Sequence, residues 1–375
     1  MKHIYLDYNA STPIAPEAAD AMRPFLSEHY GNPSSRHWAG AAARQALEKA
    51  RGQVAALLDC APQEIVFTSG GTEANNHAIK GAFFALRQRG KHIITTQVEH
   101  PAVLEPCRFL ERLGAEITYL PVDRTGMVNP EDVRKAITPG TILVSVMHAN
   151  NEVGTIQPIA EIARITRERG IPLHTDAAQS VGKIPAKVAE LGVDLLSVAG
   201  HKLCAPKGVG ALYLRGGLQL EPLMHGAGHE AGRRAGTENV LLDVALGAAC
   251  ELAAGDRESR RARLTELRDY FHAGMKHLFG AALALNGHPT MRLPNTLNVS
   301  FAGRVGSELL EALDGVAAST GSACHSGRHE LSPVLKAMGV PEAIGLGAVR
   351  FSLGRWTTTE EIDRVLALFQ TQVLK

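Results

Sequence analysis

The sequence has few cysteines, and they follow no pattern. Five occur in 375 residues and none forms a C-x-x-C pair, which argues against a zinc ribbon or a disulfide framework and favours a reducing compartment. No apolar run approaches the length of a membrane span, and the acidic Asp7 comes too early for a secretory signal peptide. We therefore expect a cytoplasmic protein with no membrane anchor and no bound metal.

The chain also lacks an excess of either charge. Lys and Arg number 39 against 38 Asp and Glu, which gives a net charge of +1, so no global field attracts nucleic acid or an anionic membrane. A hydrophobic fraction of 45% and a charged fraction of 21% are ordinary for a globular protein. The length suffices for two domains, or for one large α/β domain with an appendage.

Apolar runs and helical patterns alternate through the first half of the chain. The runs are apolar on both faces, which predicts an α/β fold with a parallel or mostly parallel sheet covered by helices. The expected strands are 64–68, 92–96, 116–120, 141–147, 172–175, 194–198 and 209–214. Before them, residues 4–8 read as a short strand, and Pro13 and Pro16 predict a helix that reaches about His29.

The pattern changes after about residue 240. One long helical segment, 240–277, precedes short strands near 297–301 and 349–353, which predicts a smaller α+β domain. We therefore expect a large domain at 13–255 and a small domain built from 1–12 and 256–375. A polar, small-residue loop around Cys324 belongs to the small domain, and its composition predicts that it is mobile.

Lys202 stands where an apolar run, 194–198, ends in a tight Gly-His-Lys turn. Burial or a neighbouring cation lowers the pKa of a lysine and makes its amine available for a Schiff base. A single lysine at a strand end is most often part of a salt bridge. The hypothesis that Lys202 carries pyridoxal 5'-phosphate (PLP) therefore requires a phosphate cradle, a carboxylate for the pyridinium nitrogen and a stacking group.

Candidates for these partners follow the expected strands. In the turn 69–72, two glycines let the backbone approach an anion, and Thr72 adds a hydroxyl at a helix N-terminus. Asp176 is suited to keep a pyridinium nitrogen protonated, and Gln179, three residues on, to donate to the phenolic oxygen. His100 is suited to stack on the ring and to move protons. Each has an ordinary structural alternative, as a helix cap or a core residue.

Together these clusters are a stronger signal than any one of them. A further polar group, 150–152, follows the strand that ends at Met147, and open α/β sheets bind ligands at the carboxyl ends of their strands. Cys324 lies among small and hydroxylic residues, where a thiol is exposed and reactive. Arg350 lies inside a strand-like run, where its guanidinium needs an anion such as a substrate carboxylate or a local Glu.

Read together, these motifs resemble the NifS/IscS-type cysteine desulfurases, which are PLP enzymes of the aminotransferase-like fold, PLP fold type I. That fold has a large domain with a mostly parallel seven-stranded sheet and a small α+β C-terminal domain. The resemblance runs from the first strand nearly to the C-terminus. The matching segments are 5–8, 67–73, 98–100, 147–152, 176–182, 200–202, 236–237, the loop around Cys324 and 350–355.

The resemblance implies a role for each matching residue. Lys202 is the Schiff-base lysine, Asp176 the pyridinium partner, Gln179 the contact to the ring hydroxyl and His100 the stacking histidine. The implied phosphate ligands are Gly71, Thr72, His201 and, from the neighbouring subunit of a homodimer, Thr237. The residues that hold the substrate carboxylate are Asn151 and Arg350, and the nucleophile is Cys324.

The activity so implied takes sulfur from L-cysteine, leaving L-alanine and a Cys324 persulfide for acceptor proteins of iron–sulfur cluster assembly or thio-modification. Two positions depart from the family pattern. Ala199 stands where a serine often adds a phosphate ligand, a neutral hydrogen bond worth about 0.5–1.5 kcal/mol. Cys204 replaces an expected aromatic residue and reads as a packing position.

Three other functions fit many of the same residues. A selenocysteine lyase differs in its preferred substrate. A class V aminotransferase or decarboxylating relative needs no cysteine. A sulfur-relay scaffold needs a partner for turnover.

Overall fold

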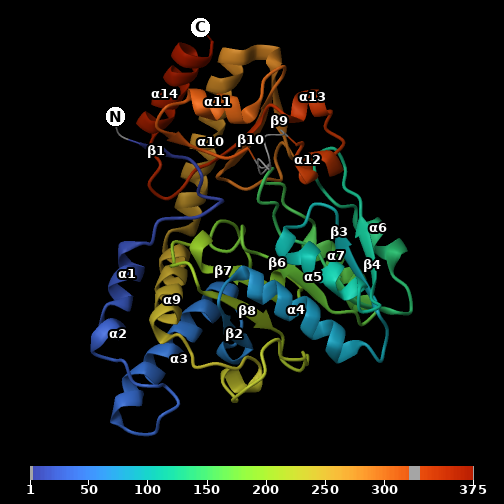
Figure 1. Ribbon diagram of the computed structural model, residues 1–375, viewed down its shortest axis with the longest axis vertical. Coiled ribbons are helices and arrows are strands. Elements are labelled where there is room, and N and C mark those ends of the chain that lie inside the picture. Colours follow the sequence, from blue (N-terminus) through green and yellow to red (C-terminus); the bar gives the residue numbers. More distant parts are fainter. Residues whose placement is uncertain (1–2, 321–329, 375) are drawn as a thin grey trace.

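A computed structural model describes residues 3–320 and 330–374 (Figure 1). Its centre is a seven-stranded sheet with the order β2-β8-β7-β6-β5-β3-β4. The strands are β2 (Ile65–Thr68), β3 (His92–Thr96), β4 (Glu116–Leu120), β5 (Thr141–Ser145), β6 (Leu173–Asp176), β7 (Leu195–Ala199) and β8 (Gly210–Leu214). β8 runs antiparallel to both of its neighbours, and the other adjacent pairs are parallel. The predicted mostly parallel seven-stranded sheet is confirmed.

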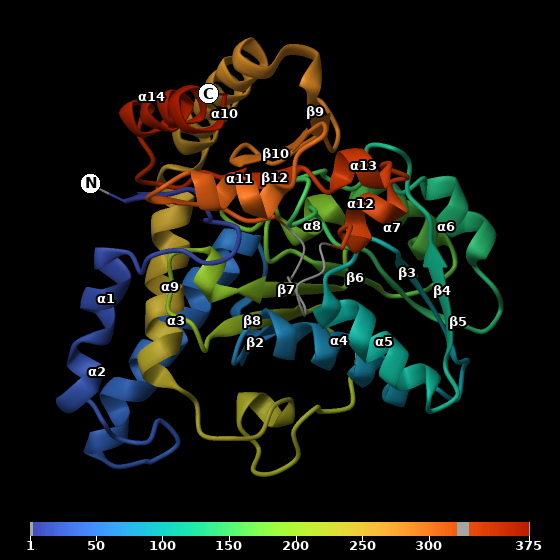
Figure 2. The ribbon, with the colours of Figure 1, turned by 45° about the horizontal axis from the view of Figure 1, so that its top comes forward.

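Helices cover both faces of this sheet because its strands are apolar on both sides. On β2, Ile65 and Phe67 face one core and Val66 the other, as the twofold period of a strand requires. The first core includes α3 (Trp38–Leu58), α7 (Ile159–Glu168) and α9 (Val240–Gly255). The second lies under α4 (Gly71–Leu86) and α5 (Pro101–Glu111), which run side by side in Figure 2.

The C-terminal part builds a second, antiparallel sheet with the order β12-β10-β9. It consists of β9 (Leu283–Asn286), β10 (Thr296–Phe301) and β12 (Ala348–Ser352). Its core packs against α10 (Arg257–Phe279) and α14 (Thr359–Leu368) and includes Phe271, Phe301, Phe351 and Phe369. In Figure 1 it stands above the large sheet, with the short helices α11 (Gly306–Ala312), α12 (Pro333–Ala337) and α13 (Glu342–Gly345).

The N-terminal segment crosses over to join this second part. β1 (Ile4–Tyr5) pairs in parallel with β11 (Val316–Ala317), and Asp7 forms an isolated bridge with Ser352 on β12. The strand is shorter than the predicted 4–8. The division of the chain into domains at 13–255 and the remainder stays a prediction.

Two predicted helices are each broken in two. The segment from Pro16 contains α1 (Pro16–Met22) and α2 (Pro24–Ser27), because Pro24 lacks the N–H that would continue α1. The segment 240–277 contains α9 and α10, which meet at Asp256, a residue with non-helical backbone angles after Gly255. The remaining helices are α6 (Pro130–Ala136) and α8 (Val188–Leu191). In the described ranges, every helix is too short or too polar to cross a membrane.

Candidate active site

A cavity of about 400 Å³ opens at the carboxyl ends of β6 and β7, between the large sheet and β12. This volume is typical of sites for small molecules and cofactors. Nine of the residues that the sequence singled out line it: Gly71, Thr72, His100, Asn151, Asp176, Gln179, His201, Lys202 and Arg350. Most of them converge because β3, β5, β6 and β7 are parallel neighbours whose carboxyl ends meet at one edge, whereas Gly71 and Thr72 follow β2 and Arg350 lies within β12.

Lys202 reaches the cavity from the short 3-10 turn Gly200–Lys202 that follows β7. Its Nζ donates hydrogen bonds to the backbone oxygens of Asn9, at 2.5 Å, and Ala10, at 2.7 Å. Burial, and after it the charge of Arg350, lowers the pKa of Lys202 to about 8. A substantial fraction of the amine is therefore neutral near physiological pH, as a nucleophilic lysine requires.

Asp176 is buried at the end of β6 with both carboxylate oxygens engaged. Oδ1 accepts from the backbone N–H of Ala178 at 2.9 Å, and Oδ2 accepts from Asn75 Nδ2 at 2.7 Å. Each carboxylate oxygen has capacity for a further donor, so Asp176 is suited to bind a protonated ring nitrogen. Asn75 lies one turn into α4 and fixes this carboxylate, a role that the sequence analysis missed.

The turn from β2 into α4 forms a cradle that only small residues fit. Gly70 has a φ of +149°, a conformation that favours glycine. A Cβ on Gly71 would lie 3.0 Å from the Cβ of Ala199, so residue 199 faces the cradle, as its expected role near a phosphate requires. With the N-terminus of the 16-residue α4 and the exposed Thr72, this turn fits an anion. Together with Asp176 and Lys202, these residues fit PLP.

His100 is the N-cap of α5, at the mouth of the cavity. Its Nδ1 accepts from the backbone N–H of Ala102 at 3.0 Å, which puts the proton of the neutral ring on Nε2. Loss of solvation lowers the pKa of His100, and the charge of Lys202 lowers it further against the opposing effect of Asp176. The ring is therefore neutral at pH 7, in a state able to stack on a flat ligand or to accept a proton.

The preceding residue, Glu99, anchors this histidine from inside the protein. Its Oε1 accepts from Thr96 Oγ1 at 2.8 Å and from the backbone N–H of Met147 at 2.9 Å, which ties the end of β3 to the segment after β5. Burial raises the pKa of Glu99 to about 8. The side chain is thus mostly protonated at pH 7, and its role is to hold the end of β3 against the segment after β5.

Arg350 enters the cavity from β12, opposite the large sheet. Nη2 donates to Asp7 Oδ1 at 2.6 Å, and Nη1 donates to the backbone oxygen of Asn151 at 3.0 Å. Its Nε is buried with no hydrogen-bond partner among the described residues. Arg350 and Asn151 are therefore neighbours. Asp7, to which the sequence analysis assigned no role, fixes the position of the guanidinium in the cavity, where it can bind an anion.

Asn9 connects nearly every part of this site, and the sequence analysis did not single it out. Its backbone oxygen accepts from Lys202 Nζ and from Gln179 Nε2, the latter at 2.9 Å. Its Nδ2 donates to the backbone oxygen of Asn151 at 3.2 Å and to Thr296 Oγ1 at 2.8 Å. No local pattern marks such a residue, because all of its partners lie more than 140 positions away.

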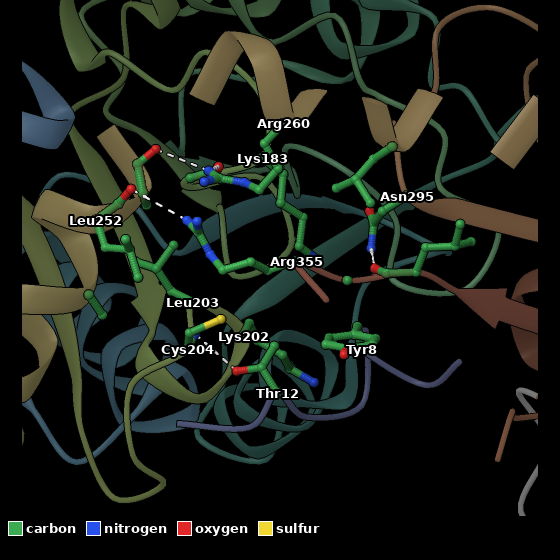
Figure 3. A pocket seen from close by; sticks show the side chains of 16 residues that line it. Tyr8, Thr12, Lys183, Lys202, Leu203, Cys204, Leu252, Arg260, Asn295 and Arg355 are labelled. Atoms are coloured by element: carbon green, nitrogen blue, oxygen red, sulfur yellow. Dashed lines mark hydrogen bonds between the residues drawn. The ribbon is translucent and has the colours of Figure 1, made fainter. Parts of the chain in front are cut away.

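A smaller cavity, of about 50 Å³, lies on the far side of the Lys202 turn (Figure 3). Cys204 borders it with a φ of +63° and packs against the main core, in line with its predicted packing position. Two arginines, Arg260 and Arg355, also line this space, and both bind Asp256. Burial raises the pKa of the Cys204 thiol, which keeps it protonated at neutral pH.

Two predicted site residues do not line the main cavity in this chain. Thr237 is exposed and lies outside it, and Cys324 falls in the segment 321–329, outside the described residues. Within residues 3–320 and 330–374, no three His, Cys, Asp or Glu side chains gather as metal ligands do.

Comparisons with known proteins agree over the whole chain. It is 52% identical over 376 residues to "Cysteine desulfurase IscS" of Dictyoglomus turgidum, across 100% of this chain and 95% of that protein. The solved structure "NIFS-LIKE PROTEIN" superposes with a TM-score of 0.93 at 38% identity, covering 100% of both chains. "SspA in complex with cysteine" gives 0.83 at 37% identity, covering 95% of this chain and 100% of that one. The pattern of the family "Aminotransferase class-V" matches residues 4–365, and the chain belongs to that family.

Proposed function

We propose that this protein is a PLP-dependent cysteine desulfurase, which removes sulfur from L-cysteine and leaves L-alanine. One observation carries the proposal: a lysine with a lowered pKa shares a cavity with a buried carboxylate, a glycine-rich helix start and an arginine. The similarity to proteins named cysteine desulfurase supports the substrate and the reaction. The structure described as a complex with cysteine supports the same substrate.

The cofactor proposed for this cavity is held by residues that line it. Asp176 binds the ring nitrogen, Gln179 the phenolic oxygen, and His100 stacks on the ring. Gly71, Thr72 and His201 bind the phosphate, and Thr237 of a second copy in a homodimer completes that set. PLP, when bound, supplies an electron sink for the negative charge that develops at the substrate Cα.

The protein's own residues bind the substrate and move its protons and its sulfur. Arg350 and Asn151 hold the cysteine carboxylate, which orients Cα toward the amine of Lys202. The neutral amine accepts the Cα proton. The Cys324 thiolate attacks the substrate sulfur, so that an S–S bond forms as the substrate Cβ–S bond breaks. The electron pair stays with the carbon fragment, which gains a proton and leaves as alanine.

The persulfide on Cys324 then passes to an acceptor protein. The proposed destination of the sulfur is iron–sulfur cluster assembly or another thio-modification pathway, since each begins with the same persulfide. The absence of a cysteine framework favours a reducing, cytoplasmic setting, in which a thiolate nucleophile persists.

Substitution of the nucleophile tests the proposal. The Cys324→Ala variant is expected to keep the yellow absorbance of bound PLP and to lose sulfide release from cysteine in the presence of a reductant. Cys60→Ala is the matched control, because Cys60 lies outside the cavity and burial raises the pKa of its thiol to about 12. Full desulfurase activity in Cys324→Ala would contradict the mechanism and favour an aminotransferase-type activity, which needs no cysteine.

A further inference from the structure

Lys183 lies between the two cavities, behind the residues that face the main one. It lines the small cavity with Lys202 and Cys204 (Figure 3). Its Nζ donates to Gln179 Oε1 at 2.9 Å and to Asn9 Oδ1 at 3.1 Å. Both acceptors belong to residues that line the main cavity, so Lys183 contacts the active site through them.

These contacts fix which way the Gln179 amide points. In its charged form Lys183 has only donors, so the atom of Gln179 that faces the ammonium must be the amide oxygen. The NH2 group must then face the other way, and it donates one hydrogen to the backbone oxygen of Asn9 at 2.9 Å. Its second hydrogen remains for a ligand in the main cavity, because among the described residues the NH2 group donates to Asn9 alone.

The surroundings of Lys183 are unfavourable for a lysine with only a packing role. Its hydrogen-bond partners are neutral amide oxygens. Burial, and after it the charges of Lys202 and Arg350, lowers the pKa of Lys183 to about 7, against the opposing effect of Cys204. Among the described residues, no carboxylate forms an ion pair with it. A half-buried cation without a counter-charge costs stability that an apolar side chain of similar length would not.

We propose that Lys183 is a positioning residue that holds the Gln179 amide with its NH2 group directed at the phenolic oxygen of the bound cofactor. The inference rests on the proposed PLP-dependent function. In this arrangement the Lys183 ammonium donates to the Gln179 amide oxygen, and the Gln179 NH2 group donates to the phenolic oxygen of the cofactor. Lys183 itself does not touch substrate or cofactor.

Loss of the ammonium should change the cofactor more than the fold. In Lys183→Met the amide loses one of the two contacts that fix it, so its NH2 group is less firmly directed at the phenolic oxygen. Both the lost donor and the lost positive charge favour protonation of the cofactor–Lys202 linkage. We expect the pH midpoint of the visible absorbance of the holoenzyme to rise by about half a unit or more, the size of one lost hydrogen bond.

A double-mutant cycle separates this role from a structural one. The shift caused by Lys183→Met should vanish when Gln179→Leu is already present, because the two residues act as a unit. Lys183→Arg keeps the donors and has the small cavity beside it, so it should restore the wild-type midpoint. Lys187→Met is the matched control, since Lys187 binds Asp59 and Glu190 and not the active site, and its midpoint should not move.

Each outcome is informative. The inference would be overturned if Lys183→Met shifted the pH midpoint equally in the wild-type and Gln179→Leu backgrounds. It would also be overturned if the folded Lys183→Met variant kept the wild-type midpoint. If Lys183→Met does not fold, Lys183→Ala, which extends an existing cavity, is measured in the same way. If the wild-type protein shows no PLP absorbance, the proposed function itself is overturned. If the wild type shows PLP absorbance and Lys183→Met has the same pH midpoint, only the role of Lys183 is overturned.

Discussion

Glu230 forms a buried ion pair that holds the strand leading into the phosphate cradle. Its carboxylate accepts two hydrogen bonds from the Arg51 guanidinium, at 2.7 and 2.8 Å, and one from the backbone N–H of Phe67, at 2.9 Å. Arg51 also donates to the backbone oxygen of Ile65 at 3.0 Å. The pair thus connects α3 to β2, whose end begins the turn at Gly70.

The Glu230→Gln variant removes the negative charge and leaves the Arg51 cation buried. The Arg51 side chain is 9% exposed and that of Glu230 is 2% exposed, so water replaces the lost partner only in part. Breaking such a pair costs about 3–5 kcal/mol. For 375 residues, an unfolding entropy of about 2.1 cal/mol/K per residue converts this into a fall in melting temperature of about 4–6 °C.

Thermal unfolding of the variant, followed by circular dichroism, measures this loss. Glu48→Gln is the control, because Glu48 contacts the same Arg51 at 3.3 Å from a side chain that is 60% exposed, and it should cost less than about 1 kcal/mol. Adding Arg51→Met to Glu230→Gln removes the stranded cation and should recover at least half of the loss. The reasoning is refuted if Glu230→Gln melts within 1 °C of wild type, roughly the effect of a neutral surface change, or if the double variant is no more stable than the single one.

Two further predictions concern the chemistry of the cavity. Because burial lowers the pKa of Lys202 to about 8, the neutral amine accumulates above that pH, and PLP capture by the apo-protein, followed by absorbance, should accelerate with a midpoint near pH 8. A midpoint near the ordinary lysine value of about 10.4 would contradict this assignment. Arg350→Lys keeps a cation beside Asp7 but loses the planar fork, so kcat/KM for cysteine should fall about 10- to 100-fold with PLP absorbance unchanged. Unchanged kinetics would exclude Arg350 as the carboxylate ligand.

The sheet was predictable from the sequence because its strands are continuous apolar runs. β3 and β4 begin and end at the predicted residues, 92–96 and 116–120. The helix breaks near Pro24 and Asp256 were missed, although Pro24 and Gly255 stand at them in the sequence.

The residues of the main cavity were predictable where a functional side chain ends a strand, as Asp176 does, or follows one within a few residues, as His100 does. The residues that support them were not. Asn75 reaches Asp176 across 101 positions, and Asn9 reaches Lys202 across 193. A hydrogen bond across such a separation exists only once the fold has formed, and neither partner carries a local sign of it. The resemblance to a family supplied the roles of individual residues, while the apolar pattern supplied the framework that brings them together.

The position of the N-terminal segment has a consequence for how this protein is made. Asn9 donates its backbone N–H to Ser352 Oγ at 2.9 Å, across 343 positions, and the backbone N–H of Ser352 donates to the backbone oxygen of Leu6 at 2.7 Å. During translation the segment around Asn9 therefore waits for Ser352, 343 positions later. At about 5–20 residues per second, that interval is roughly 20 to 70 s. The carbonyls that hold Lys202 belong to this segment, so a nascent chain can complete the cavity around Lys202 only after Ser352 has been synthesised.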